Sequence, residues 1–485
     1  MGCHRVLEFS LAVVLCLVSA GVAAQGSESV DGRPNILVIL VDDLGYGDLG
    51  VYDHPTIRTP NIDRLAAEGI RFTDFYSAAP VCSPARAAFL TGRIPVRTGI
   101  YDWIPPGSDM HLSAEEATVA EILRAAGYQT SMFGKWHLNG ALDSDQPQPD
   151  DHGFNHWFAT AGFAMPTHLN PVNFVSDGEE VGPTEGYACQ IVTDEAIRWL
   201  REDREPTQPF FAYLAYHEPH EVIASPPELT AGYEAAQNGN EALYFANVTN
   251  LDLALGRLLA ALDEMGLTDD TFVLFTSDNG PEMLERHPQA QRSYGSAGPL
   301  RGKKLQLWEG GIRVPGIVRW PGHTQPGSVS GAAVSGIDLL PTVCAVAGVP
   351  VPVELELDGI DITPIFAGEV LDREVPLFWY HYKAWGGPRA VMREGRWKLA
   401  GFWDGPERLR SDSSTMRPGD LELIRTTELI RFELFDIEAD PGERADVAAK
   451  NPAVFKAMHA EMVRLLAEVE SDARHDWQES WLRRW

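Results

Sequence analysis

Three long apolar runs constrain the fold of this chain more than any other feature. They cover residues 35–41, 210–216 and 271–276, and none of them alternates between apolar and polar side chains. Such runs are typical of strands buried on both faces, which occur in parallel sheets covered by helices. Because helical patterns separate the runs, the sequence predicts an α/β fold with a large mixed, mostly parallel sheet flanked by helices.

Two of the intervening helices can be delimited from the sequence. The first is predicted over 113–126, where Ser113 and Glu116 have the spacing of a capping box and Gly127 ends the helix. The second is predicted over 243–265, because four leucines recur on one stripe of a helix there.

The pattern changes after about residue 367. The later part contains a hairpin pattern at 389–399 around Gly395, a strand pattern at 433–436 and an amphipathic helix pattern at 452–469. We therefore expect a main domain over 33–367 and a smaller C-terminal α+β domain over 368–485.

Residues 1–24 have the pattern of a secretory signal peptide. Arg5 precedes a short apolar run at 9–18, and small residues come before Gln25. The run is too short to span a bilayer comfortably, and no later segment is long and apolar enough. We expect an exported protein, periplasmic or extracellular, without a membrane span.

Charge and cysteine content narrow the class of protein further. A net charge of −30 argues against a nucleic-acid partner, and it means that an anionic substrate must be met by a local cationic pocket. Two of the five cysteines lie in the predicted signal, which leaves Cys82, Cys189 and Cys344. Three cysteines are too few to build a disulfide framework. Cys189 and Cys344 either pair or stay buried and reduced.

Cys82 lies at the start of a predicted helix. The helix is expected over 83–90, with Ser83 as its cap, Pro84 at an early position and Gly92 at its end. The dipole and the free N–H groups at such a helix start favour negative charge. The position of Cys82 therefore favours a role in handling an anion.

Two polar pairs follow buried runs directly. Asp42 and Asp43 come after the first run, and Asp278 and Asn279 come after the run at 271–276. In α/β sheets ligands bind at the carboxyl ends of strands, and oxygen ligands suit Ca²⁺ or Mg²⁺. Either pair alone is explained by a turn; the two together predict a metal site.

Cations and imidazoles are expected at the same edge of the sheet. Lys135 and His137 follow the segment 129–133, and they share a face if that segment is extended. His217 and His220 follow the second apolar run, and we expect one of them to be structural. The candidates for an anion pocket and for proton transfer are Arg86, Lys135, His137, His220 and one residue of the pair 303–304. This set describes hydrolysis of a sulfate or phosphate ester.

The chain closely resembles the formylglycine-dependent sulfatases of the alkaline phosphatase superfamily. The resemblance is carried by the motifs at 82–86, 134–137, 217–220 and 308–311. It implies an alkaline phosphatase-like fold and conversion of Cys82 to Cα-formylglycine by a formylglycine-generating enzyme. The implied Ca²⁺ ligands are Asp42, Asp43, Cys82, Asp278 and Asn279. The implied catalytic residues are Cys82, Arg86, Lys135, His137, His220 and Lys304, with Lys303 as a bystander.

The same resemblance implies a mechanism. One hydroxyl of the hydrated aldehyde attacks sulfur, and the other later loses a proton so that sulfate leaves and the aldehyde returns. His137 is implied in that deprotonation, and His220 with Lys304 in assisting the leaving oxygen. The chain departs from the family pattern at Asn139, where the family often has glycine.

The residues of the motifs at 217–220 and 308–311 are similar to those of bacterial relatives of arylsulfatases and N-acetylgalactosamine-6-sulfatases. This resemblance implies a sulfated saccharide or an aryl sulfate as substrate. Candidates for lining a sugar site are Trp103, Trp157, Phe163, His168, Trp385 and Trp403, although core packing explains each one alone. The alternatives are a phosphonate monoester or phosphodiester hydrolase with the same nucleophile, and a catalytically silent glycan-binding protein.

Overall fold

The computed structural model describes residues 1–2, 32–283, 294–383, 385–407, 409 and 419–474. The predicted signal peptide lies outside these residues from residue 3 onward. Within the described part, no helix combines the length and the apolar character that a membrane span requires.

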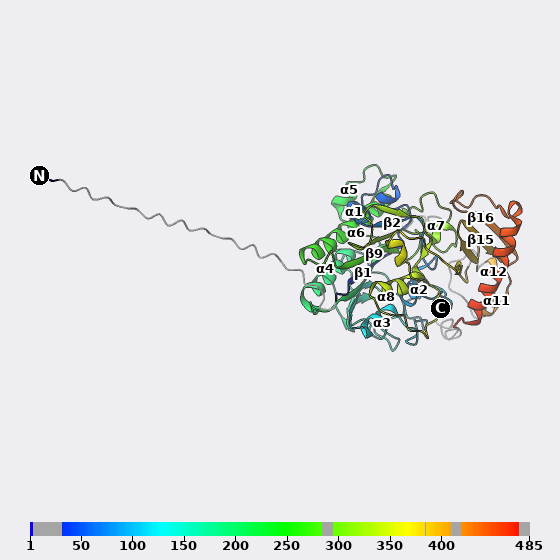
Figure 1. Ribbon diagram of the computed structural model, residues 1–485, viewed down its shortest axis with the longest axis horizontal. Helices are drawn as coiled ribbons and strands as arrows, with labels where there is room; N and C mark the ends of the chain where they lie inside the picture. Colours follow the sequence, from blue (N-terminus) through cyan, green and yellow to red (C-terminus); the bar gives the residue numbers. More distant parts are fainter. Residues whose placement is uncertain (3–31, 284–293, 384, 408, 410–418, 475–485) are drawn as a thin grey trace.

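A ten-stranded sheet forms the centre of the molecule (Figure 1). Its strands, in order across the sheet, are β11 (Ser328–Ser330), β2 (Ile70–Phe72), β10 (Gly316–Arg319), β9 (Thr271–Ser277), β1 (Asn35–Asp42), β8 (Phe210–Pro219), β4 (Gln129–Lys135), β5 (His156–Thr160), β6 (Val175–Ser176) and β7 (Glu179–Glu180). The strands from β9 to β5 are all parallel, whereas β10 runs antiparallel to both of its neighbours. The α/β fold with a mixed, mostly parallel sheet is confirmed.

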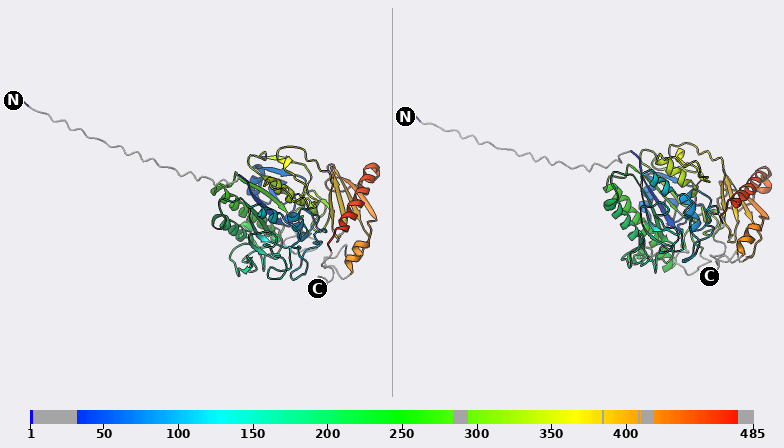
Figure 2. Two further views of the ribbon diagram at one scale, coloured as in Figure 1. Left: turned by 60° about the horizontal axis from the view of Figure 1, so that its bottom comes forward. Right: turned by 90° about the horizontal axis from the view of Figure 1, so that it is seen from below.

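The three apolar runs are the strands β1, β8 and β9, and every residue in them is buried. They are buried on both sides because helices cover both faces of the sheet (Figure 2). Alternate side chains of β1 belong to two different hydrophobic clusters. One cluster includes α2 (Cys82–Thr91), α3 (Val119–Ala125) and α8 (Leu339–Val346); the other includes α1 (Pro60–Ala67), α4 (Ala188–Arg198) and α6 (Gly239–Glu264).

Shorter elements connect these layers. They are η1 (Gly50–Tyr52), β3 (Phe75–Tyr76), η2 (Trp199–Asp203), α5 (Pro227–Ala231), α7 (Glu309–Ile312), β12 (Val334–Ser335), η4 (Gly336–Asp338), α9 (Thr363–Phe366) and η5 (Ala448–Lys450). Of these, β3 and β12 pair as a separate two-stranded sheet.

The predicted start of the helix over 113–126 is wrong. Helix α3 begins at Val119, and its capping box joins Thr118 to Glu121. The same pattern therefore recurs five residues later, and there both of its hydrogen bonds form. The carboxylate of Glu116 instead accepts hydrogen bonds from Arg93. Helix α6 was predicted correctly but begins earlier, at Gly239, behind an Asn238 cap.

The C-terminal part forms a four-stranded antiparallel sheet at one side of the molecule (Figure 1). Its strands are β13 (Leu377–Tyr380), β14 (Ala390–Glu394), β15 (Trp397–Phe402) and β16 (Arg431–Asp436), and its helices are α11 (Asp420–Thr426) and α12 (Pro452–Ser471). The predicted hairpin, strand and helix are all present. The domain boundary near residue 367 stays a prediction.

A buried charge cluster joins this C-terminal sheet to the main body. Lys398 in β15 lies 2.9 Å from a carboxylate oxygen of Glu309 in α7 and 2.9 Å from one of Glu443. Burial raises the pKa of both carboxyls, but Lys398 and Arg313 outweigh it at Glu309, where the pKa falls to about 2. At Glu443 burial prevails and the pKa is about 7. The cluster fixes α7, which follows the segment that carries Lys304.

Candidate active site

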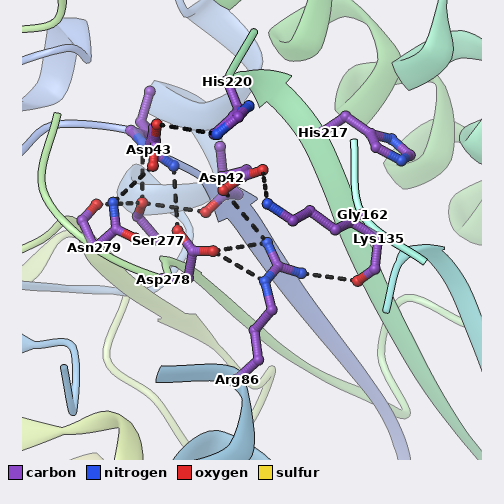
Figure 3. Close-up of polar contacts among 12 residues, drawn as sticks. Asp42, Asp43, Arg86, Lys135, Gly162, His217, His220, Ser277, Asp278 and Asn279 are labelled. Atoms are coloured by element: carbon purple, nitrogen blue, oxygen red, sulfur yellow. Dashed lines mark hydrogen bonds and ion pairs between the residues drawn. The ribbon is translucent and has the colours of Figure 1, made fainter. Parts of the chain in front are cut away.

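The candidate site lies at the carboxyl edge of four adjacent parallel strands, β9, β1, β8 and β4. Each strand delivers polar residues where it ends, and neighbouring strands lie about 4.8 Å apart. Figure 3 shows the side chains of Asp42, Asp43, Asp278 and Asn279 converging there, with Arg86 and Lys135 approaching them. The two polar pairs predicted to meet are thus brought together.

Three carboxylates form the centre of the site. Asp42, Asp43 and Asp278 are at most 1% exposed, and one ligand oxygen from each lies within 4.8 Å of the others. Asn279 donates its amide to Asp43 Oδ1 at 2.8 Å. Within the described part of the chain, Asp42 Oδ1, Asp43 Oδ2 and Asn279 Oδ1 accept no hydrogen bond although they are buried. Such oxygens are rare unless an ion or water completes them.

Three cations lie against these carboxylates. Arg86 donates to Asp278 Oδ2 through Nε and Nη2, at 3.0 and 2.7 Å, and through Nη1 to the carbonyl oxygen of Lys135. Lys135 Nζ lies 2.6 Å from Asp42 Oδ2, and Lys304 Nζ lies 2.6 Å from Asp43 Oδ1. Carboxylates and cations are therefore equal in number around this centre.

The pKa values show that one carboxylate is poorly stabilised. Burial would raise the pKa of Asp42, but Lys135, His220 and Arg86 outweigh it and hold that pKa well below its usual range. At Asp278, burial and the charge of Asp42 outweigh Arg86, and the pKa rises to about 7. A further cation beside Asp278 would favour its ionised form. The donor set of carboxylate and amide oxygens fits a hard cation such as Ca²⁺.

Cys82 is the first residue of α2 and is 3% exposed. The predicted cap at Ser83 is wrong: Val81 is the N-cap, and the Ser83 hydroxyl accepts from the backbone of Ile104 instead. Gly92 ends the helix in a left-handed conformation, as predicted. Burial raises the pKa of the Cys82 thiol, although Lys135 and Lys304 oppose it. The encoded thiol is thus protonated at neutral pH and is a poor nucleophile.

A cavity of about 200 Å³ opens beside Cys82. Its lining consists of Val81, Cys82, Trp103, Pro106, His137, Phe163, His220, Glu221, Glu282, Lys304 and Leu305. Three of the predicted catalytic residues, His137, His220 and Lys304, therefore face the cavity together with Cys82. Arg86 and Lys135 lie behind it, where they hold the carboxylates and the helix start.

The two imidazoles reach the cavity in different ways. β4 ends at Lys135, and His137 has a φ of 58°, so the two side chains do not share a strand face as an extended segment would require. His137 Nε2 lies 3.0 Å from the carbonyl oxygen of Ile104. His220 Nε2 lies 3.9 Å from Asp43 Oδ2, and its ring stacks on Phe163. Burial lowers both pKa values, that of His220 to about 3.

The remaining candidates divide into pocket and core. Trp103 and Phe163 line the cavity, and Trp385 packs against the cluster that includes Cys82. Three are core residues instead: Trp157, His168 and Trp403. Lys303 donates to the carbonyl oxygen of Gly295, and Asn139 to the segment at 147–148. Cys189 and Cys344 are buried free thiols.

Sequence reasoning did not name four of the residues that line the cavity: Pro106, Glu221, Glu282 and Leu305. Glu221 directly follows His220, and Leu305 directly follows Lys304, so proximity to a predicted residue was a usable signal for these two. Pro106 and Glu282 lie on connecting segments and carry no pattern that marks them.

Family models match most of the chain. Residues 34–349 match the family model described as sulfatase, and residues 302–411 match the model described as N-sulphoglucosamine sulphohydrolase, C-terminal. The chain is 35% identical to arylsulfatase A of Homo sapiens, with 94% of this chain and 90% of that protein covered. It is also 35% identical to N-acetylgalactosamine-6-sulfatase of Canis lupus familiaris, covering 81% of this chain and 75% of that protein.

The fold has close counterparts among solved structures. A crystal structure of Ps i-CgsB in complex with k-i-k-neocarrahexaose superposes with a TM-score of 0.77 at 28% identity and covers 91% of this chain and 94% of that chain. The match of the family model over more than half of the chain agrees with the buried carboxylates, the cations and the cysteine at the helix start. The chain belongs to the sulfatase family of sulfuric ester hydrolases.

Proposed function

We propose that this protein removes sulfate from sulfated saccharides, with Cys82 oxidised to Cα-formylglycine as its nucleophile and with Ca²⁺ bound at the carboxylates. The observation that carries the proposal is the position of Cys82. It begins α2 at the wall of a cavity whose other groups include two imidazoles and a lysine. Three buried carboxylates lie behind it, and among the described residues one oxygen each of Asp42 and Asp43 accepts no hydrogen bond.

The absent groups would each supply one kind of chemistry. Asp42, Asp43, Asp278 and Asn279, together with the modified residue 82, would hold Ca²⁺, which stabilises negative charge on the sulfuryl oxygens. The hydrated aldehyde at position 82 would supply a hydroxyl nucleophile that the buried, protonated thiol does not provide.

The residues of the chain supply the proton transfers. The carbonyl of Ile104 can only accept a hydrogen bond, so His137 Nε2 carries the proton and Nδ1 is the basic nitrogen. Nδ1 has no hydrogen-bond partner among the described residues, and it is our candidate for the base that deprotonates residue 82. His220 and Lys304, on the Asp43 side of the cavity, are placed to assist the leaving oxygen.

Arg86 is a positioning residue in this proposal. It is fully buried and binds Asp278 and the backbone of Lys135, so it fixes one metal ligand and one end of β4 without facing the cavity. Lys135 and Lys304 add positive charge on either side of the metal ligands, which suits binding of an anionic ester.

Three observations support a saccharide as the substrate. One relative is an N-acetylgalactosamine-6-sulfatase, and one similar structure is a complex with k-i-k-neocarrahexaose. In this chain, Trp103 and Phe163 place aromatic rings beside the nucleophile position, and such rings pack well against the apolar faces of sugars. Export through the signal at 1–24 is part of the same proposal, and the exported protein is then expected to begin at Gln25.

The test is a desulfation screen over defined sulfated saccharides, with an aryl sulfate and an aryl phosphonate as reporter substrates. The protein is produced with a formylglycine-generating enzyme, and mass spectrometry of the peptide containing residue 82 measures conversion. Cys82→Ala, which cannot be converted, is the control. Sulfate release that depends on conversion supports the proposal. Faster turnover of the phosphonate, or full activity of Cys82→Ala, would overturn it.

A further inference from the structure

One short segment contacts both histidines of the cavity. It runs from Thr160, the last residue of β5, to Phe163. His137 donates its backbone N–H to the carbonyl oxygen of Ala161 at 2.9 Å. Gly162 lies so close that a Cβ built there would be 4.0 Å from Cδ2 of the His137 ring. On the other side, the Phe163 ring stacks on His220, with centroids 5.9 Å apart and planes at 12°.

A hydrogen-bonded chain fixes this segment from behind. The Thr160 hydroxyl donates to the carbonyl oxygen of Gly162 at 2.6 Å, and it lies 2.8 Å from Nε2 of His217. A hydroxyl has one proton, and the carbonyl can only accept, so the hydroxyl must accept from His217. His217 therefore carries its proton on Nε2. Figure 3 shows His217 and Gly162 set apart from the carboxylates, on the side of Lys135.

His217 itself does not reach the cavity. It is fully buried in β8, three residues before His220, and the edge of its ring meets Phe174. Among the described residues it forms no ion pair with a carboxylate, and its Nδ1 has no hydrogen-bond partner. The polar group that His217 contacts is therefore the Thr160 hydroxyl, and Thr160 begins the segment that lies beside both imidazoles of the cavity.

We infer that His217 and Thr160 are positioning residues, which set the 160–163 segment so that His137 and His220 face residue 82 at the same time. The assignment of proton transfer to His137 and His220 rests on the proposed function. The inference goes beyond it, because neither His217 nor Thr160 contacts the cavity. A displacement of reacting groups by about 1 Å is enough to lower turnover by roughly a hundredfold.

The first test replaces Thr160 by valine, which keeps the shape and removes the hydroxyl. Thr130→Val is a matched control: its hydroxyl is also buried and donates to a glycine carbonyl, that of Gly153, at 2.6 Å, but at the opposite end of β4 from the site. Both variants should lose similar thermal stability. Thr160→Val should also lose about 10- to 100-fold in kcat, with KM changed by less than about threefold. Thr160→Ser, which keeps the hydroxyl, should recover most of that loss.

The second test acts on His217 and remains informative if Thr160→Val does not fold. Glutamine places an N–H donor where Nε2 was, whereas methionine fills similar space without a donor. His217→Gln should keep turnover within about threefold of the wild-type rate, and His217→Met should lose about 10- to 100-fold. In nitrogen-15 NMR of histidine-labelled protein, one imidazole in the Nε2–H form should disappear in His217→Gln.

All rates are taken relative to the wild type on whichever reporter ester it hydrolyses, so a wrong substrate assignment leaves the ratios readable. The inference is overturned if Thr160→Val matches Thr130→Val in kcat, or if His217→Gln and His217→Met lose turnover equally. An Nδ1–H form of His217 in the NMR spectrum also overturns it.

Discussion

Removing the Ca²⁺ proposed for this site with a chelator should abolish turnover and leave the protein folded. The reason is the charge around the metal ligands. The three carboxylates of Asp42, Asp43 and Asp278 lie against three cationic side chains in the described part of the site. The side chains nearly neutralise one another, so the buried cluster does not depend on a metal to stay intact. A bound divalent ion would add two positive charges beside the anionic substrate.

The size of both effects follows from the charge of the ion and the length of the chain. At about 4 Å and an effective dielectric constant of about 20, one unit charge contributes roughly 4 kcal/mol to the interaction with an anion. Losing the ion should therefore lower kcat/KM by at least about a thousandfold. An ion whose free concentration is about 100 times its Kd stabilises the folded state by about 2.7 kcal/mol. For a chain of this length, that corresponds to a fall in Tm of only about 3 °C.

The assay measures aryl sulfate turnover and thermal unfolding before chelation, after chelation and after Ca²⁺ is restored. Lys304→Met removes one balancing cation and should make the chelated protein unfold at a clearly lower temperature. Lys303→Met is the control, because it removes the adjacent lysine, whose Nζ donates to the carbonyl oxygen of Gly295. Full turnover after proven removal of the metal refutes the reasoning, and so does unfolding of the chelated wild type at room temperature.

Three further predictions concern stability and are measured by urea-induced unfolding. Lys398→Met leaves two buried carboxylates without their shared cation, so the unfolding free energy should fall by about 3–5 kcal/mol, and a fall under about 1 kcal/mol contradicts this. Burial lowers the pKa of His156, but the hydrogen bond to Asp177 and the carboxylate of Glu195, 3.6 Å from Nε2, outweigh it and raise that pKa to about 9. The charged form of His156 therefore stabilises the protein fully below about pH 6.5. About 1–2 kcal/mol of the unfolding free energy should be lost as the pH rises through 9, and His156→Gln should not show this loss. Thr118→Ala removes the cap of α3 and should cost about 1 kcal/mol, whereas Ser113→Ala at the unused pattern should change stability by less than half of that.

The sheet could be predicted from the sequence because burial on both faces leaves a direct trace in composition. A strand such as β1 has to be apolar at every position, and polar residues reappear only where the strand ends. That is why Asp42 and Asp278, 236 residues apart in the sequence, could be assigned to one edge of a parallel sheet. The capping pattern at Ser113–Glu116 predicted the wrong helix start. A short motif such as Ser113–Glu116 competes with tertiary contacts, and the ion pair with Arg93 takes its carboxylate.

Other features depend on contacts that no local pattern encodes. His137 has a left-handed backbone conformation, and its ring lines the cavity. Strand periodicity instead predicts that His137 lies on the same face as Lys135. The hydrogen bond between Thr160 and His217 joins residues 57 positions apart, and it arises because β5 and β8 both flank β4. Glu282 lines the cavity from a connecting segment. The sequence therefore predicts which groups the site contains, and the three-dimensional fold determines how they face one another.

The order of the strands separates the tasks of the site along one edge. The proposed metal ligands lie at the ends of β9 and β1, the imidazoles follow β8 and β4, and the segment that supports both imidazoles begins at the end of β5. With about 4.8 Å between strands, these five strands extend over about 19 Å, which is wider than the sulfate group on which they act. The groups that touch the substrate are therefore brought inward by loops, and each loop is held from behind by buried residues of a neighbouring helix or strand. Arg86 does this for Asp278, and Thr160 with His217 does it for the two histidines. In such an arrangement, turnover depends on buried residues that never contact the substrate, and their replacement should lower kcat more than it raises KM.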